Sequence, residues 1–311
     1  MKITRIEAIP VNVPFKKPFV VWRGVVKTKD HVIALVETDE GIIGLGEASP
    51  FLYYAPETQQ DVVSTLENYF PALLIGEDPF DLERIGQMLD QNVDGHHFSK
   101  AAIEMALWDI IGQKLGEPLY RLLGGKCRPS VPVVAILHNG EPAEMAKEAC
   151  EWVSKGFKHL KVKIGFETDR DVARVEAVRQ AVGEGVSIRV DAEESYDLKG
   201  ALGVARRLQK VGLELFSQPI PRHNHDDMAT LRRLIDIPLL LDESIITPED
   251  VLTAVRLGCG DLINIKVVKS GGILNSKRMA AIARAAGKAC LVGSMLEMGP
   301  GTVFAGHFAL S

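Results

Sequence analysis

A short unit repeats through the second part of the chain and limits the folds that this sequence can adopt. Apolar runs alternate there with amphipathic stretches such as PAEMAKEACEWVSKG, DVARVEAVRQAVGEG and LKGALGVARRLQKVG. The apolar runs end at seven positions, separated by 27, 27, 26, 25, 24 and 28 residues: Leu137, Ile164, Asp191, Ser217, Asp242, Lys266 and Ser294. A strand followed by a helix at this spacing predicts βα units and a parallel sheet. Many units in series favour a closed barrel over a doubly wound sheet.

The number of units is one short of the eight that a closed (β/α) barrel contains. After the seventh apolar run, GPGTVFAGHFALS predicts the start of a helix, and the sequence ends there, so the eighth unit is absent. We expect a truncated version of a longer chain, because an unclosed barrel leaves an edge strand unpaired. A barrel closed in an unusual way is the alternative.

Residues 1–125 have a different pattern, which predicts an α+β domain in front of the barrel of residues 126–311. The patterns with period two predict strands at 3–13, 31–38 and 41–48. The patterns with helical period predict helices at 56–74, 80–92 and 99–116. Asp39-Glu40-Gly41 is suited to a hairpin turn, and Gly116 is suited to end a helix.

Composition excludes several classes of protein. The chain has 36 Lys+Arg against 41 Asp+Glu, a net charge of −5, so it lacks the basic excess of a nucleic-acid-binding protein. No apolar run of about 18 residues is present to cross a membrane, and the N-terminal MKITRIEAIPVNVPF alternates like a strand instead of a signal peptide. The four cysteines are widely spaced and form no CxxC motif. This pattern is typical of a reducing compartment and predicts a cytoplasmic protein.

Charged and polar residues gather at the predicted strand ends, where the active sites of α/β barrels form. Lys161 and Lys163 are two residues apart on the second predicted strand and therefore share a face. Asp191 and Glu193 share a face in the same way, because the third strand is predicted to run through SIRVDAEESY. The later runs end in polar residues as well: Ser217, Asp242, Lys266, and Ser294 followed by Glu297.

This arrangement of charges indicates a particular chemistry. Carboxylates from successive strands suit a hard divalent cation such as Mg²⁺. Lysines on opposite flanks of that cation suit removal and return of a proton on either face of a carbon, next to a carboxylate whose enolate the metal stabilises. Burial and neighbouring positive charge are expected to lower the lysine pKa toward the working pH. A single charged strand end is ordinarily just a solvated terminus, so the prediction depends on five of them in succession.

Eight segments follow one another along the chain: GEASPFLYYAPET, AAIEMALWDIIGQKLGEPLYRLLGG, KVKIG, VDAE, SQPIP, DES, KVVKSGGI and GSMLE. In content and order they resemble the enolase superfamily and, within it, the muconate lactonizing enzyme subgroup. The resemblance is highly specific for the family and weakly specific for the reaction. It implies a modified TIM barrel, an α+β domain that caps it, and bound Mg²⁺ or Mn²⁺.

The resemblance also implies roles for individual residues. Lys161 and Lys163 match the family's KxK pair, with Lys163 as one acid/base, and Lys266 matches the opposing acid/base. Asp191 and Asp242 match metal ligands. Glu297 matches an acidic residue near the seventh strand.

Substrate contacts are expected from the capping domain and from the first barrel strand. Residues 18–28 resemble the mobile loop that closes over substrate, and residues 51–55 resemble a second specificity loop. Their aromatic residues are expected to select the substrate: Phe19, Trp22, Phe51, Tyr53 and Tyr54. His138 follows the first barrel strand and either contacts substrate or has no role.

Two positions depart from the family pattern. Ser217 stands where the family has a metal-binding Glu in an EQP motif, and Glu193 stands where the family usually has Asn. Because Asp191 and Glu193 are predicted to share a face, Glu193 is a candidate for the carboxylate that Ser217 lacks. The alternatives are a weakened site, since a hydroxyl is a poor ligand, and a site without metal chemistry.

These features predict an isomerase that abstracts the proton alpha to a carboxylate through a metal-stabilised enolate. Lysines on both faces favour a racemase or epimerase of amino-acid derivatives. A muconate-type cycloisomerase and an acid dehydratase are alternatives that use the same lysines. A non-catalytic relative that binds a small acid is an alternative of a different class. The expected partners are a small carboxylate substrate and further copies of the chain in a symmetric dimer or octamer, with no nucleic acid and no membrane.

Overall fold

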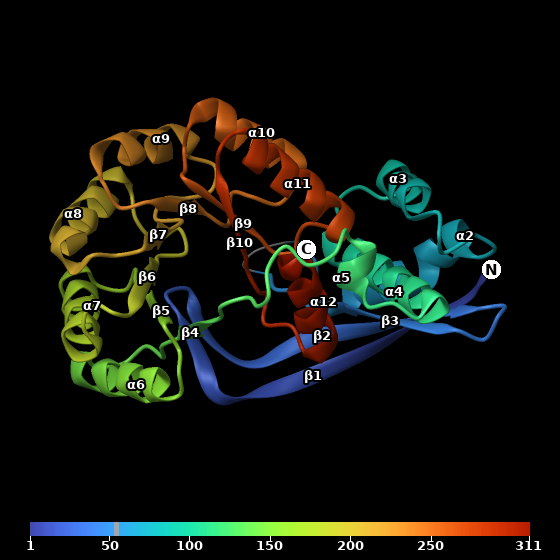
Figure 1. Ribbon diagram of the computed structural model, residues 1–311, viewed down its shortest axis with the longest axis horizontal. Helices are drawn as coiled ribbons and strands as arrows, with labels where there is room; N and C mark the ends of the chain where they lie inside the picture. The colour runs from blue at the N-terminus through green and yellow to red at the C-terminus, as the bar shows by residue number, and fades with distance from the viewer. Residues whose placement is uncertain (53–55) are drawn as a thin grey trace.

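The structure, a computed structural model, describes residues 1–52 and 56–311 and contains a three-stranded and a seven-stranded sheet (Figure 1). Tyr53 and Tyr54 lie outside the described residues. The first sheet is antiparallel, with the order β1 (Ile3–Val21), β2 (Gly24–Thr38) and β3 (Ile43–Ala48). Five helices follow it: α1 (Gln59–Ser64), α2 (Phe70–Leu74), α3 (Leu82–Asn92), α4 (His97–Leu115) and α5 (Leu119–Leu122). A π-helical segment, Thr65–Tyr69, joins α1 to α2.

Two glycines of β3 explain how the N-terminal sheet and helix α4 pack together. A Cβ atom on Gly46 would lie 1.8 Å from the carbonyl oxygen of Ala102, and one on Gly44 would lie 2.1 Å from that of Ala106. Only glycine permits so close an approach of a strand to a helix backbone. Helix α4 ends at Gly116, whose φ of 65° is left-handed, which confirms the predicted helix end.

The second sheet is parallel, and its seven strands lie in chain order. They are β4 (Val134–Ile136), β5 (His159–Lys163), β6 (Ser187–Asp191), β7 (Leu215–Ser217), β8 (Leu239–Leu241), β9 (Leu262–Ile265) and β10 (Ala289–Val292). The helices between and after them are α6 (Pro142–Ser154), α7 (Thr168–Val182), α8 (Leu198–Leu208), α9 (His225–Leu234), α10 (Pro248–Leu257), α11 (Ile273–Ala285) and α12 (Gly299–Leu310). Each observed strand ends within two residues of its predicted end, so the repeat is confirmed.

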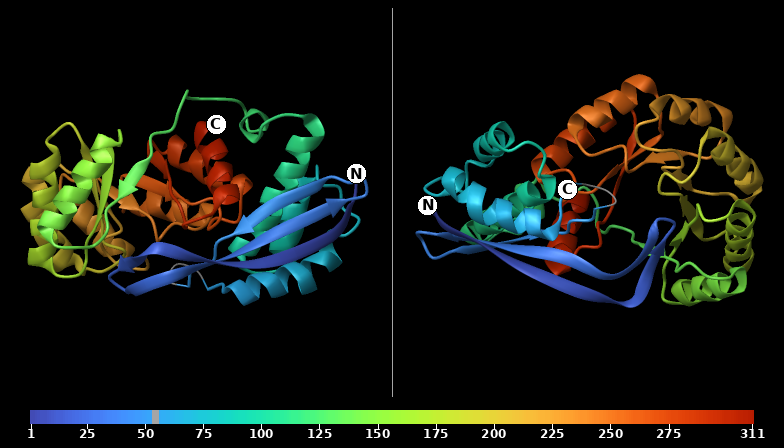
Figure 2. Two further views of the ribbon diagram at one scale, coloured as in Figure 1. Left: turned by 90° about the horizontal axis from the view of Figure 1, so that it is seen from below. Right: turned by 180° about the vertical axis from the view of Figure 1, so that it is seen from behind.

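The parallel sheet curls into a half-barrel, with α6 to α11 along its outer side (Figures 1 and 2). Within residues 1–52 and 56–311, β4 and β10 are the sheet edges and do not pair with each other. The parallel βα units of the predicted barrel are therefore present in the described part of the chain as an open half-barrel. No described helix is long and apolar enough to cross a membrane.

The segment 18–28, expected as a loop, is the tip of a long β-hairpin. Strand β1 continues to Val21, and the pairs Phe19 with Val26 and Val21 with Gly24 close the hairpin after a register shift that begins at Pro14. Figures 1 and 2 show this hairpin reaching from the N-terminal sheet to the half-barrel near β4 and β5. The hairpin therefore brings residues from the start of the chain to the strand ends.

Candidate active site

A cavity of about 530 Å³ lies at the concave side of the curled sheet and is open to the N-terminal hairpin. Nine residues predicted for the site line it: Phe19, Phe51, Lys161, Lys163, Asp191, Glu193, Asp242, Lys266 and Glu297. The curl of the sheet brings them together, because parallel strands all present their carboxyl ends at one edge.

The side of the cavity formed by β5 and β6 carries two lysines on one aspartate. Lys163 pairs with Asp191 across the two strands, and its Nζ lies 2.7 Å from Asp191 Oδ2. Lys161 Nζ lies 2.6 Å from the same oxygen, so both lysines of the KxK pair do share a face. Burial alone would raise the pKa of Asp191, but the two lysines outweigh it and hold that pKa well below its usual range.

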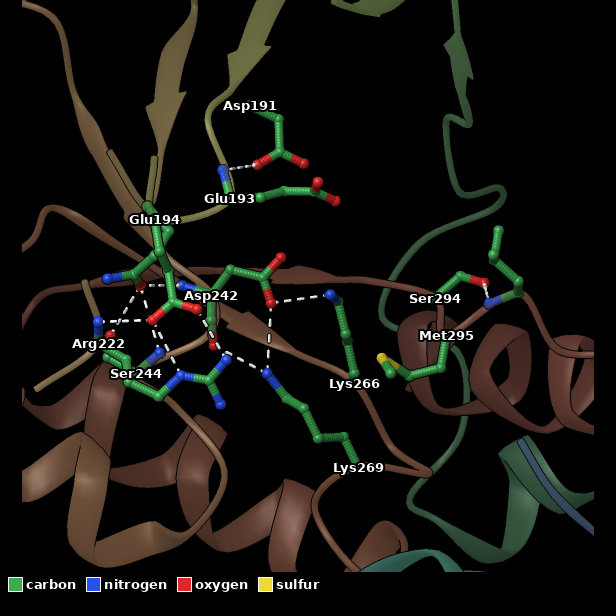
Figure 3. Close-up of polar contacts among 12 residues, drawn as sticks. Asp191, Glu193, Glu194, Arg222, Asp242, Ser244, Lys266, Lys269, Ser294 and Met295 are labelled. Atoms are coloured by element: carbon green, nitrogen blue, oxygen red, sulfur yellow. Dashed lines mark hydrogen bonds and ion pairs between the residues drawn. The ribbon is translucent and has the colours of Figure 1, made fainter. Parts of the chain in front are cut away.

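The other side of the cavity repeats this arrangement, but here the aspartate precedes the two lysines in the sequence. Asp242 follows β8, and its Oδ1 lies 2.9 Å from Lys266 Nζ, which follows β9. Lys269 also points at Asp242, with Nζ 2.8 Å from the Asp242 carbonyl oxygen and 3.3 Å from Oδ1 (Figure 3). Lys269 was not predicted as a site residue, although it lies in the KVVKSGGI motif, because its complete burial appears only in the fold.

The expected lowering of the lysine pKa values is wrong for this structure. Burial lowers the pKa of Lys163, but the Asp191 and Glu193 carboxylates raise it by more, so that it lies above its ordinary value. Asp242 and Glu243 have the same effect on the pKa of Lys266. The carboxylates therefore hold both lysines in the protonated form.

Glu193 reaches the site for a different reason than the one predicted. Strand β6 ends at Asp191, and Glu193 lies in a turn with a left-handed φ of 46°, so the two residues do not alternate on one strand. The turn nevertheless brings the Glu193 carboxylate to Lys163, which bonds to both acidic side chains. Figure 3 shows Asp191 and Glu193 side by side.

Two buried oxygen atoms near the aspartates accept or donate no hydrogen bond within the described residues. One is the hydroxyl of Ser217, at the end of β7 between the strands that carry Asp191 and Asp242. The other is Oε2 of Glu243, a residue that lines the cavity and is 2% exposed. Burial, together with the charges of Asp242 and Asp191, raises the pKa of Glu243 to about 8. Glu243 was not predicted, because the DES motif was assigned through its Asp alone.

The tip of the β1–β2 hairpin is bonded to the loop that follows β6, and that loop is bonded in turn to the loop that follows β7. The indole N–H of Trp22 donates to the carbonyl oxygen of Glu193 at 2.6 Å. Arg23 donates to Glu194 Oε2 at 2.6 Å, and Arg222 donates to the same oxygen at 2.7 Å. Phe19 points into the cavity, with its ring centre 6.0 Å from Lys163 Nζ. Arg23, Glu194 and Arg222 were not predicted, because only the hairpin brings them together.

The remaining predicted residues lie at the margin of the cavity or outside it. Glu297 follows β10, and its Oε2 accepts the backbone N–H of Met295 at 2.9 Å. His138 lies outside the main cavity, in a depression beside α6, where its ring contacts Glu148. Trp22 does not line the cavity but contacts the loop that does.

The residues present fit a hard divalent cation by donor chemistry. Asp191, Asp242, Glu193 and Glu243 supply carboxylate oxygens, and Oε2 of Glu243 is a buried oxygen that lacks a partner in the described structure. The same residues are not assembled as a ready cluster: the described His, Cys, Asp and Glu side chains form no group of three positioned to hold a metal. Instead, the carboxylate oxygens of Asp191 and Asp242 form ion pairs with Lys161 and Lys266.

Two family models match most of this chain. The profile "Mandelate racemase / muconate lactonizing enzyme, N-terminal domain" matches residues 3–124, and "Enolase C-terminal domain-like" matches residues 144–311. The N-succinyl-L-Arg/Lys racemase of Bacillus cereus is 35% identical over 312 residues, which cover 100% of this chain and 85% of the racemase.

Two solved structures combine high structural similarity with bound ligands. A dipeptide epimerase from Enterococcus faecalis V583, complexed with Mg and the dipeptide L-Leu-L-Tyr, has a TM-score of 0.96 at 34% identity, covering 100% of this chain and 87% of the epimerase. A muconate lactonizing enzyme from Pseudomonas fluorescens, complexed with muconolactone, has a TM-score of 0.96 at 35% identity. The match covers 99% of this chain and 84% of the lactonizing enzyme.

Proposed function

The chain belongs to the mandelate racemase/muconate lactonizing enzyme family of the enolase superfamily, and we propose that it racemises or epimerises N-acylated amino acids or dipeptides. The observation that carries this proposal is the pair of lysines on opposite sides of the cavity. Lys163 lies on the Asp191 side and Lys266 on the Asp242 side. A carbon held between them has one ammonium or amine group facing each of its two faces.

The proposed reaction is a proton transfer that inverts one carbon centre. One lysine, in its neutral form, takes the proton from the carbon alpha to the carboxylate, and the electron pair of the broken C–H bond moves toward that carboxylate. The other lysine, in its ammonium form, returns a proton to the opposite face and forms the new C–H bond. With Lys163 and Lys266 exchanging these roles, both directions of the reaction use the same site.

Asp191 and Asp242 are proposed to hold Mg²⁺ or Mn²⁺. The sequence predicts Glu193 as the third carboxylate, and Glu243 lines the same cavity as a second candidate for that place. When bound, the cation would neutralise the carboxylates that raise the lysine pKa values and stabilise the negative charge that the substrate carboxylate gains. Lys161 Nζ lies 2.6 Å from Asp191 Oδ2, and we propose that this contact helps to hold the Asp191 side chain in place. Glu297 lies at the cavity rim, where we propose a supporting role.

The proposed substrate has an apolar part as well as a carboxylate. Phe19 and Phe51 line the cavity on the side of the N-terminal sheet, together with Ile136 and Met295 on the barrel side. We propose that Trp22, Tyr53 and Tyr54 help to select the substrate, and that His138 touches only substrates that extend past β4. The match to a muconate lactonizing enzyme favours a cycloisomerase as the second candidate. Ser217 stands where the family has a metal-binding Glu, and this favours a binding protein without turnover as the third candidate function.

Solvent exchange at the alpha carbon tests the proposed function. The enzyme is incubated in deuterium oxide with Mg²⁺ and single enantiomers of N-acyl amino acids and dipeptides, and deuterium uptake is followed by NMR. Lys163→Ala is expected to abolish exchange from one enantiomer and Lys266→Ala from the other, while the exposed Lys199→Ala exchanges both like the wild type. Lactone formation from a muconate without any exchange would favour the cycloisomerase, and absence of all turnover would favour the binding protein.

We further propose a symmetric homo-oligomer and a cytoplasmic location. The family resemblance supports the first, and the absence of disulfides among the four cysteines supports the second. Light scattering on the purified chain tests the oligomeric state.

A further inference from the structure

The neighbouring strands β6, β7 and β8 lead to three adjacent positions at one edge of the sheet, and the middle one lacks a carboxylate. Asp191 ends β6, Ser217 ends β7 and Asp242 follows β8. The Ser217 hydroxyl is fully buried and unbonded within the described residues. The serine side chain is small, and no described neighbour forms a hydrogen bond with its hydroxyl.

Glu243, the residue after Asp242, has a carboxylate oxygen that no described residue satisfies. Its side chain is 2% exposed and lines the cavity, and Oε2 accepts no hydrogen bond in the described structure. An unpaired buried carboxylate is costly, and native proteins rarely keep one without a partner. The neighbouring charges that act on it most strongly are the carboxylates of Asp242 and Asp191, which add repulsion.

Hydrogen bonds of Gln218 connect the end of β7 to the segment that contains Glu243. Gln218, the residue after Ser217, donates its backbone N–H to the carbonyl oxygen of Leu240 at 2.9 Å. The Gln218 side-chain oxygen accepts the backbone N–H of Asp242 at 3.0 Å and the hydroxyl of Ser244 at 2.9 Å. Gln218 therefore ties the end of β7 to both sides of Glu243.

Glu193, the other candidate, differs in its contacts. Its carboxylate is bonded to Lys163 on the far side of Asp191, and its backbone is bonded to Trp22 of the hairpin. The charges of Lys266 and Lys269 act on Glu243 as well, but its Oε2 accepts no hydrogen bond in the described structure and is available to a cation.

We infer that Glu243 supplies the third carboxylate for a divalent cation held by Asp191 and Asp242, in the space that the small Ser217 side chain leaves. This inference rests on the proposed function, because it presumes that the site binds a metal. It assigns Glu193 to Lys163 instead of to the cation. Four acidic residues then serve two purposes: three hold the metal and one holds the lysine.

Mn²⁺ binding to the full chain, followed by calorimetry and by the loss of the free-ion electron paramagnetic resonance signal, tests this inference without any substrate. Glu243→Gln, which keeps size and shape, is expected to weaken Mn²⁺ binding at least tenfold. Glu193→Gln is expected to change it less than threefold, and the exposed Glu249→Gln not at all. Ser217→Glu in the Glu243→Gln background is expected to restore binding, which also shows that the double variant folds.

The outcomes separate the inference from the proposed function. Wild-type affinity in Glu243→Gln, with binding lost in Asp242→Asn, would overturn the role of Glu243 and leave the metal site standing. Loss of binding in Glu193→Gln alone would assign the third ligand to Glu193 and also overturn it. No binding by the wild type at millimolar Mn²⁺ would overturn the metal-dependent function itself.

Discussion

Replacing Glu104 by Gln is expected to stabilise the protein above neutral pH. Glu104 lies on α4, and its Oε1 accepts the backbone N–H groups of Ile273 at 2.7 Å and Leu274 at 3.0 Å, at the start of α11. The indole of Trp108 donates to the same oxygen at 3.1 Å. Gln keeps this acceptor without carrying a charge, and residue 104 lines a small cavity together with residues of α3 and α11.

The magnitude follows from the shifted acidity of this group. Burial raises the pKa of Glu104 from 4.5 to about 7, and the three hydrogen bonds offset only part of that effect. Between these two pH values the folded state binds more protons than the unfolded state, so stability falls as pH rises through this window. Above pH 7 the whole penalty is present, about 3 kcal/mol at full burial and about 2 kcal/mol once the partial exposure of the side chain is allowed for.

Urea unfolding of the wild type and Glu104→Gln between pH 5 and pH 8 measures this penalty. The variant is expected to gain about 2 kcal/mol relative to the wild type across that range, with most of the gain between pH 5 and pH 7. Glu176→Gln on the exposed surface of α7 serves as the matched control and should show no such trend. Parallel stability curves for the wild type and Glu104→Gln would refute the reasoning, because they would mean that Glu104 titrates alike in the folded and unfolded chain.

Three further perturbations follow from single contacts. Arg23→Ala should raise KM about tenfold by removing the bond of the hairpin to Glu194, whereas the exposed Lys27→Ala on the same hairpin should not; equal KM values would contradict a closing role for this contact. Asp171→Asn should cost about 3 kcal/mol in urea unfolding, because the buried carboxylate accepts the backbone N–H groups of residues 165, 166 and 167, and the exposed Asp169→Asn is the control. Gly272→Ala should lower the midpoint of urea unfolding, because its Cβ would lie 2.2 Å from Glu104 Oε2 and the backbone there has a φ of 121°. Gly185→Ala is the control, since its Cβ would meet open space and should leave the midpoint unchanged. Equal midpoints for the two variants would show that Glu104 moves away freely.

The order of elements in the half-barrel was predictable because each unit is local. A strand and the helix after it bury their apolar faces within about 27 residues, so periodicity and spacing alone located seven strand ends. The long hairpin was less predictable. Pro14 and Pro18 interrupt the alternating pattern, and the predicted strand ends at residue 13, whereas tertiary contacts extend it to Val21.

The sequence by itself determined which chemical groups this site contains. Lysines and carboxylates at successive strand ends must meet wherever parallel strands curl, so the order of Lys163, Asp191, Asp242 and Lys266 along the chain is enough to predict them as one group. The family could also be recognised from short motifs, since those motifs are the strand ends themselves.

Only the tertiary structure decided how these groups affect one another. The short distances between lysines and carboxylates raise the pKa values of Lys163 and Lys266 above their ordinary value. A turn, and not the alternation of residues along a strand, brings Glu193 to Lys163. Burial without a partner, which distinguishes Glu243 and Ser217, is a property of the surroundings and has no sequence pattern. The physical reason is that electrostatic and hydrogen-bond energies depend on distance and exposure across chain segments far apart, whereas strand and helix periodicity depends on neighbours in sequence.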